Sequence, residues 1–192
     1  MTSLIHLFFD PTHVLKCCYN NFFTRKLLKC PDFDGENVEA NFEHIKTLYK
    51  MEFGKSPKYA YKLTDKVISP NGIEKTSVKL ADALFHPSTI NGVRVYGEKS
   101  NPESNPEFLK TAHFLQIIRN WWDSINVKSK GVCFQKRDSN KDEININNPP
   151  KKTEKYQAIV DWLSEWQVNC KENKMKRNGL SDETFLTFKQ TT

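Results

Sequence analysis

The sequence predicts a mainly α-helical protein with one short β-strand near its N-terminus. Two observations favour helices: apolar residues recur at three- and four-residue spacing in several segments, and capping residues precede these segments. The third observation is the apolar run at 4–9, which has the length and composition of a buried strand. A chain of 192 residues usually forms one domain, or one domain and a fragment of another.

The predicted strand at 4–9 runs directly into a predicted helix. Asp10 is a residue type that caps helices, and Pro11 suits the first helical position. We expect this helix to stop before Pro31, in a turn-rich connection at 30–40.

The remaining elements are predicted to be helices separated by polar connections. Helical stripes or caps occur at 41–53, 65–68, 78–85, 106–126 and 153–169, and a last helix begins after Ser181. The connection at 86–105 is expected to hold a capped turn at Ser88 followed by a polar loop. Both ends of the chain suggest a piece of a longer protein.

Composition narrows the classes of function. The net charge is +6 and the isoelectric point about 9.0, which suits nucleic acid or another polyanion, and equally an ordinary basic domain. Basic segments at 128–136, 151–152 and 171–177 are candidates for phosphate contacts or for solvated helix faces. No apolar run reaches the roughly 18 residues of a membrane span, and we expect no signal peptide. Five cysteines without a C-x-x-C spacing indicate a reduced intracellular protein without a zinc site.

Three blocks, in order, carry a resemblance to a known family. They are "FFDPTHVLKCCYNNF", "YKLTDKVISPNGIEKTSVKLADALF" and "FLQIIRNWWDSIN". Together they resemble the P-element type of DNA transposase, the THAP-domain-associated transposases. The matching residues are Asp10, His13, Lys16, Asn20-Asn21, Lys62-Leu63-Thr64, Val78-Lys79-Leu80-Ala81, Asp123 and Asn126.

The resemblance implies an RNase H-like catalytic domain interrupted by a helical insertion that binds GTP. Residues 1–30 would be a fragment of the catalytic domain, 31–180 the insertion domain, and 181–192 the start of a truncated helix. Asp10 would be one of three catalytic acids that hold Mg²⁺, since two-metal phosphoryl transfer needs several converging carboxylates. The other two acids are not in this sequence, so the chain alone is not expected to cleave or join DNA. Without the resemblance, Asp10 before Pro11 is an ordinary helix cap.

The resemblance also implies a GTP site formed by Lys62, Ser77, Val78, Asp123 and Asn126. The Asp123 carboxylate can accept two hydrogen bonds from a guanine edge, and Asn126, three residues later, shares its helical face. Trp121 and Trp122 beside them are candidates to stack on the base. Without the resemblance, the Asp-x-x-Asn pattern favours a solvated helix end over a base-binding site.

The phosphates would meet Lys62 and the backbone amide of Val78. The family carries a lysine immediately before this valine, whereas this chain carries Ser77, so weakened GTP binding is expected. Lys75 or Lys79 would compensate in part. No Walker-type glycine-rich loop is present, and nothing indicates GTP hydrolysis.

The sequence therefore predicts a fragment of a nuclear P-element-like transposase, which binds GTP and DNA and self-associates as part of the full-length protein. The alternative is a domesticated or decayed derivative that acts as a non-catalytic DNA- or protein-binding module. Ser77 and the missing acids favour this alternative modestly.

Overall fold

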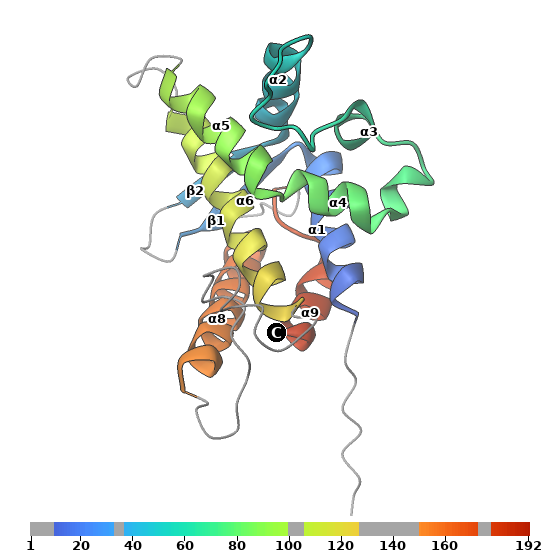
Figure 1. Cartoon of the computed structure of the whole chain (residues 1–192). Coiled ribbons are helices and arrows are strands. Elements are labelled where there is room, and N and C mark those ends of the chain that lie inside the picture. Colours follow the sequence, from blue (N-terminus) through green and yellow to red (C-terminus); the bar gives the residue numbers. More distant parts are fainter. Residues whose placement is uncertain (1–9, 33–36, 100–105, 127–149, 173–177) are drawn as a thin grey trace, which may run out of the picture.

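The computed structural model describes residues 10–32, 37–99, 106–126, 150–172 and 178–192. These residues form a helical body with one small antiparallel hairpin, so the predicted mainly α fold class is confirmed (Figure 1). The predicted strand at 4–9 lies outside the described residues. The elements are α1 Pro11–Arg25, β1 Leu27–Pro31, β2 Asn37–Asn41, α2 Phe42–Glu52, α3 Asp65–Ile68, a 3-10 turn Glu74–Thr76, α4 Val78–Leu84, α5 Pro87–Lys99, α6 Pro106–Ile125, α8 Pro150–Glu172 and α9 Asp182–Thr191.

Capping residues begin the helices where the sequence predicted. The Asp10 carboxylate accepts the Thr12 backbone N–H at 2.9 Å, and the Asn41 side chain accepts the Glu43 N–H at the same distance. Ser181 caps α9 by accepting the Thr184 N–H at 3.3 Å. Each cap satisfies one of the amides that a helix start leaves without an intrahelical partner.

The hairpin corrects the prediction of a longer first helix and a turn-rich connection. Helix α1 ends at Arg25, and the next residue, Lys26, has a φ of 66° that turns the chain out of the helix while its N–H donates to the Phe22 carbonyl. The next residues pair as Leu28 with Ala40 and Cys30 with Val38, all four of them buried. The alternation is only five residues long on each strand, too short to separate from a helix end in the sequence.

Helix α5 corrects the prediction of a polar loop after Ser88. His86 begins this helix: its carbonyl accepts the Thr89 and Ile90 N–H groups, and its Nδ1 accepts the Ser88 N–H at 3.1 Å. A Cβ at Gly97 would lie 2.8 Å from the Cβ of Phe108 on α6. Gly97 therefore allows the close packing of α5 on α6.

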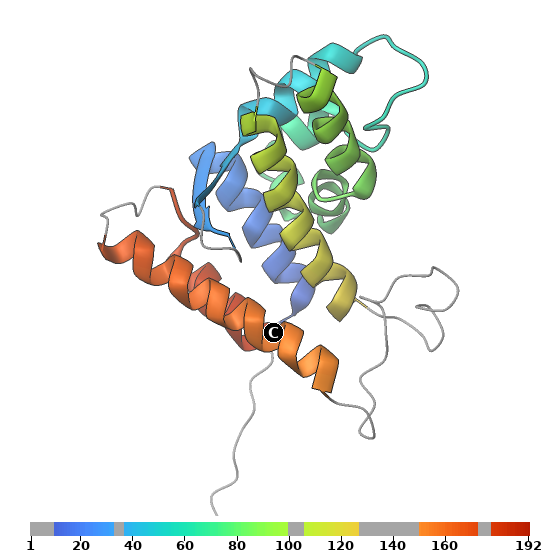
Figure 2. The same ribbon diagram turned by 90° about the vertical axis from the view of Figure 1, so that its left-hand side faces the viewer.

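The core lies where α1 and α6 meet α8 and α9. Phe114 on α6 is fully buried, with its ring centroid 5.3 Å from Phe22 on α1 and 6.1 Å from Trp166 on α8. Trp166 in turn contacts Phe185 on α9 at 5.2 Å. Figure 2 shows α8 lying across the start of α1 and the end of α6. One apolar cluster thus joins elements from both ends of the described chain.

The predicted division into 1–30, 31–180 and 181–192 stays a prediction. Strand β1 spans its first boundary and pairs with β2, and α9 contributes to the common core. Among the described helices, none is long and apolar enough to cross a membrane. The basic segment at 128–136 lies outside the described residues, as does most of 171–177.

Candidate functional site

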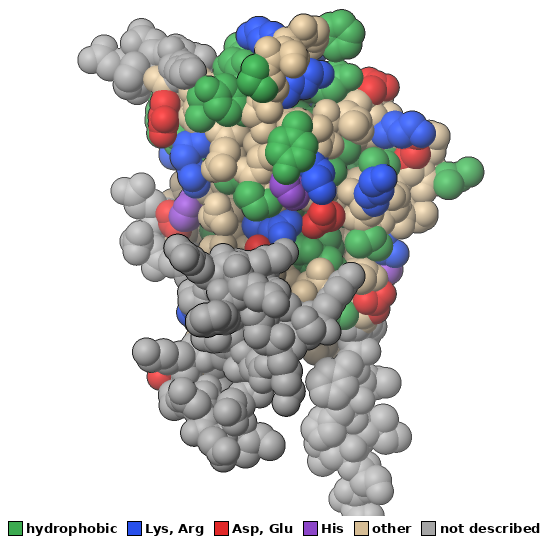
Figure 3. Space-filling model, viewed as in Figure 1, with side chains coloured by type: hydrophobic (Ala, Val, Ile, Leu, Met, Phe, Trp, Pro, Cys, Tyr) green, Lys and Arg blue, Asp and Glu red, His purple; other side chains and the backbone are tan. Residues whose placement is uncertain are grey.

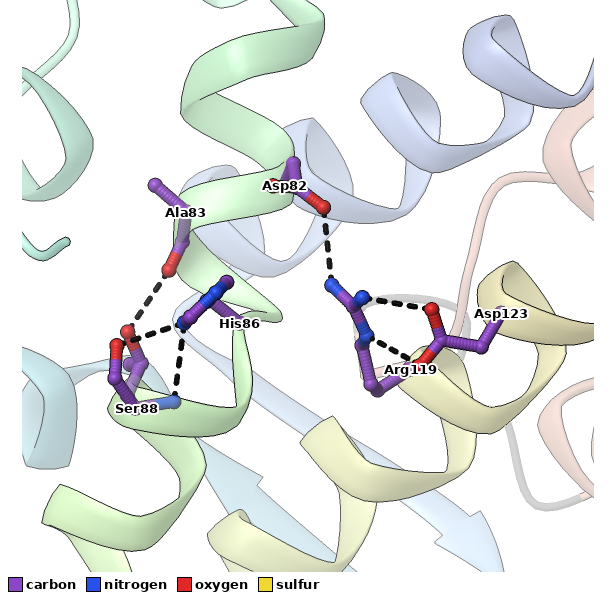
Figure 4. Close-up of polar contacts among 7 residues, drawn as sticks. Asp82, Ala83, His86, Ser88, Arg119 and Asp123 are labelled. Atoms are coloured by element: carbon purple, nitrogen blue, oxygen red, sulfur yellow. Dashed lines mark hydrogen bonds and ion pairs between the residues drawn. The ribbon is translucent and has the colours of Figure 1, made fainter. Parts of the chain in front are cut away.

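A group of charged side chains from separate elements meets on one face of the molecule. We call Lys62, Asp82, His86, Arg119 and Asp123 the charged cluster. Asp82 lies on α4, His86 in the turn between α4 and α5, and the last two on α6. Figure 3 shows acidic, basic and histidine side chains beside one another near the middle of this face, and Figure 4 shows the contacts of Asp82, His86, Arg119 and Asp123.

Arg119 is the centre of the cluster. Its Nε donates to Asp123 Oδ2 at 2.8 Å and its Nη2 donates to Oδ1 at 2.7 Å, a bidentate pair along α6 (Figure 4). Its Nη1 donates to Asp82 Oδ1 at 3.0 Å and so links α6 to α4. The Arg119 and Asp123 side chains are only 12% and 13% exposed, so solvent screens this pair much less than a surface pair.

The pKa of His86 is affected by the charges of the other four members of the cluster. Burial, and then the positive charges of Lys62 and Arg119, lower the pKa of His86 below its usual range, while Asp82 and Asp123 oppose this shift. The exposed Tyr61 packs edge-on against the imidazole, with ring centroids 5.7 Å apart. The charges of Lys62 and Asp123, which lie far apart in the sequence, therefore both affect the pKa of His86, in opposite directions.

The other predicted site residues lie at helix ends. Ser77 occupies the N-cap position of α4 without making a side-chain capping bond, and Val78 is the first residue of that helix. Because α4 also carries Asp82, its start lies little more than one turn from the cluster. Asn126 is exposed just after α6, with its N–H bonded to the Trp122 carbonyl at 2.9 Å.

The expectation that Trp121 or Trp122 stacks on a base is wrong. The two side chains are 0% and 5% exposed, respectively. Trp121 packs on Phe188 with ring centroids 4.4 Å apart, and its Nε1 donates to Thr192. Tyr61, which is 64% exposed, is the aromatic side chain that borders the cluster.

Sequence reasoning missed Asp82, His86, Arg119 and Tyr61. The pairing of Arg119 with Asp123 had a signal, since opposite charges four residues apart on a helix lie within reach of each other. Nothing in the sequence indicated that Asp82 would meet them, because that contact depends on how α4 packs near α6.

Asp10 takes the helix-capping role that its sequence position suggested. Hydrogen bonds from the side chain and then the backbone of Thr12 lower the pKa of its carboxyl, and the carboxylate is exposed. Within the described ranges, no three His, Cys, Asp or Glu side chains are grouped as a metal site would require. The described residues by themselves therefore do not form a Mg²⁺ site.

Comparison with a solved structure assigns the fold. A chain of the Drosophila P element transposase strand transfer complex matches 95% of this chain with a TM-score of 0.65 and 20% sequence identity. The match spans only 38% of that chain, so this sequence is similar to one part of the transposase chain. The helical architecture is thus one that also occurs in a DNA transposase.

A family comparison makes the assignment more specific. The model of the TNP-like, GTP-binding insertion domain matches residues 12–140, well over half of the 192 residues. The chain belongs to this family of P-element-type transposase insertion domains, as the three sequence blocks predicted. No curated protein matches the sequence.

Proposed function

We propose that this chain binds GTP through Lys62, Ser77, Val78, Asp123 and Asn126. The observation that carries the proposal is the geometry at Asp123, whose two carboxylate oxygens accept two adjacent N–H donors from one planar group. The N1–H and 2-amino groups of guanine form a donor pair of the same kind. Adenine lacks this pair, so the site would select guanine.

The remaining contacts follow from the elements around Asp123. Asn126 lies on the same helical face and would address the O6 and N7 edge of the base. Lys62 is exposed and close enough to His86 to affect its pKa, which supports a role at the charged end of the ligand. Ser77 and Val78 would meet the phosphates at the start of α4, with Ser77 supplying a hydroxyl instead of the lysine charge typical of the family.

Calorimetric titration with GTP and ATP tests this proposal. Micromolar GTP binding with much weaker ATP binding is expected, and Asp123→Asn should weaken GTP binding at least tenfold because its amide replaces one acceptor with a donor. Asp161→Asn, an exposed change on α8, is the matched control and should leave binding unchanged. Equal affinities for GTP and ATP, or an Asp123→Asn variant that binds like the parent chain, would refute guanine recognition.

In the full-length protein, we propose that the domain serves cut-and-paste DNA transposition in the nucleus. Asp10 would contribute one of the carboxylates that hold Mg²⁺, with the others supplied outside this sequence. GTP would then be a structural or DNA-positioning ligand.

The second candidate is a non-catalytic derivative that binds DNA or protein. Ser77 favours it, since a hydroxyl supplies no charge for the phosphates. Failure of GTP to bind at millimolar concentration would leave only this candidate.

A further inference from the structure

The Arg119–Asp123 pair has a consequence for the proposed GTP site, on which this inference rests. The guanidinium of Arg119 presents two adjacent N–H donors, from Nε and Nη2, to Oδ2 and Oδ1 of Asp123. Guanine contains a guanidine unit of its own, formed by C2 with N1, N3 and the 2-amino group, of which N1 and the 2-amino group carry the N–H donors. We propose that Arg119 occupies the place of guanine on Asp123, and that GTP binds by exchanging with this side chain.

Simultaneous binding is excluded by the shape of a carboxylate. A planar donor pair approaches along the two lone pairs that point the same way, one on each oxygen. Arg119 already uses both of them. The two lone pairs that remain diverge from one another, so they cannot receive the parallel N1–H and N2–H bonds of guanine.

Asp82 can remain a hydrogen-bond and ion-pair partner of the displaced arginine. Its Oδ1 accepts Nη1 of Arg119 at 3.0 Å, a bond that does not involve Asp123 and that can persist after the exchange. The Asp82 side chain is 33% exposed, so the charge of Arg119 would be compensated at an accessible position. Keeping this contact would also preserve the link between α4 and α6.

Arg119 stands between Asp123 and an incoming guanine, because it already occupies both carboxylate oxygens. His86, also beside Arg119 and Asp82, is tied to Ser88 through Nδ1. Exposing the acceptors that guanine needs would therefore require Arg119 to move.

Substitutions at Arg119 test the exchange because they should tighten nucleotide binding. If Arg119 served only to attract the anionic nucleotide, removing its charge would weaken binding instead. Arg119→Lys keeps the positive charge but cannot offer the planar donor pair, so guanosine and GTP should both bind about tenfold more tightly. Arg119→Gln should also tighten guanosine binding, although it removes a positive charge from a site for an anionic nucleotide.

Asp82→Asn should change guanosine binding in the opposite direction from the Arg119 substitutions. Without the Asp82 carboxylate the displaced arginine has a poorer partner, so guanosine binding should weaken severalfold even though a negative charge has been removed. Glu165→Gln, an exposed change on α8, is the control and should have no effect. Thermal unfolding of each variant, with and without guanosine, verifies that the chain folds.

The outcomes separate this inference from the proposed function. If the parent chain selects GTP and Asp123→Asn abolishes binding, but Arg119→Lys binds equally or more weakly, then Arg119 orients Asp123 and the exchange is overturned. If neither the parent chain nor Arg119→Lys binds guanosine or GTP, the proposed guanine site itself fails. If Arg119→Lys binds guanosine and GTP more tightly than the parent chain, and adding Asp123→Asn abolishes that binding, the result supports both the guanine site and the exchange.

Discussion

Restoring a lysine at position 77 should strengthen binding of the proposed nucleotide through its phosphates. Ser77 is half-buried at the N-cap of α4, and its side chain makes no capping bond. Replacing it therefore forfeits little of the roughly 1 kcal/mol that a working cap contributes. Ser77→Lys thus adds a charge at small cost to the fold.

The size of the effect follows from the position at a helix start. An ammonium there is disfavoured by the helix dipole by about 0.3–1 kcal/mol at most. A phosphate about 4 Å away attracts it by about 1 kcal/mol in bulk water and about 4 kcal/mol at the effective dielectric of a protein surface. A net gain near ~1.5 kcal/mol corresponds to about tenfold tighter GTP binding.

Titration calorimetry with GTP and with guanosine measures this gain. The improvement should appear with GTP and be absent with guanosine, which carries no phosphate. Ser77→Gln has a long side chain that can donate a hydrogen bond but carries no charge, so it should not show the gain in GTP binding expected of Ser77→Lys. If Ser77→Lys improves guanosine and GTP equally, or improves neither while GTP still binds, the start of α4 does not meet the phosphates.

Three further predictions concern stability and are measured by chemical denaturation. Phe114→Ala should lower the free energy of unfolding by about 3–5 kcal/mol, because this fully buried ring packs on α1 and α8. Gly97→Ala should destabilise the protein although alanine is the better helix former by about 1 kcal/mol, because its Cβ would lie 2.8 Å from that of Phe108. Burial lowers the pKa of His44 against the opposing charge of Glu107, so the unfolded state binds more protons and stability should fall as the pH drops below about 6.5.

Each of these has a control. Phe114→Leu should cost clearly less than Phe114→Ala, and equal losses would argue against tight packing at this position. Gly72→Ala, where an added Cβ meets nothing within 4 Å, should be close to neutral, whereas a stabilising Gly97→Ala would contradict the close approach of α5 and α6. His44→Gln should reduce the loss of stability between pH 7.5 and 5.5, and an unchanged pH profile would show that His44 does not cause it.

Local patterns were enough to predict most helices and their starts. The apolar stripe of α6 and the caps at Asp10 and Ser181 were predicted because each depends on residues within one or two turns. The likeness of three ordered blocks to a family was also readable from the sequence, and the family comparison confirms it. The GTP-binding residues remain proposals, since their roles require a ligand.

Errors arose where distant residues decide the local structure. Contacts of this kind were also left unpredicted: Glu52 is 3% exposed, and its carboxylate accepts the backbone N–H groups of Tyr59 and Ala60 at 2.9 and 3.0 Å. A glutamate at the end of an amphipathic helix gives no sign of that role. Gly97 disfavours a helix when considered alone. Its role becomes clear only in the folded structure, where α6 packs so closely against it that there is no room for a Cβ.

The sequence by itself determined the helical segments, their capping residues and the family. These depend on the period of a helix and on contacts between near neighbours, which a linear pattern records directly. Only the tertiary structure decided the β1–β2 hairpin, helix α5 and the meeting of Asp82 with Arg119 and Asp123. Those features depend on which surfaces of the folded helices pack together, and residues 37 positions apart carry no local signal that they will share a hydrogen bond.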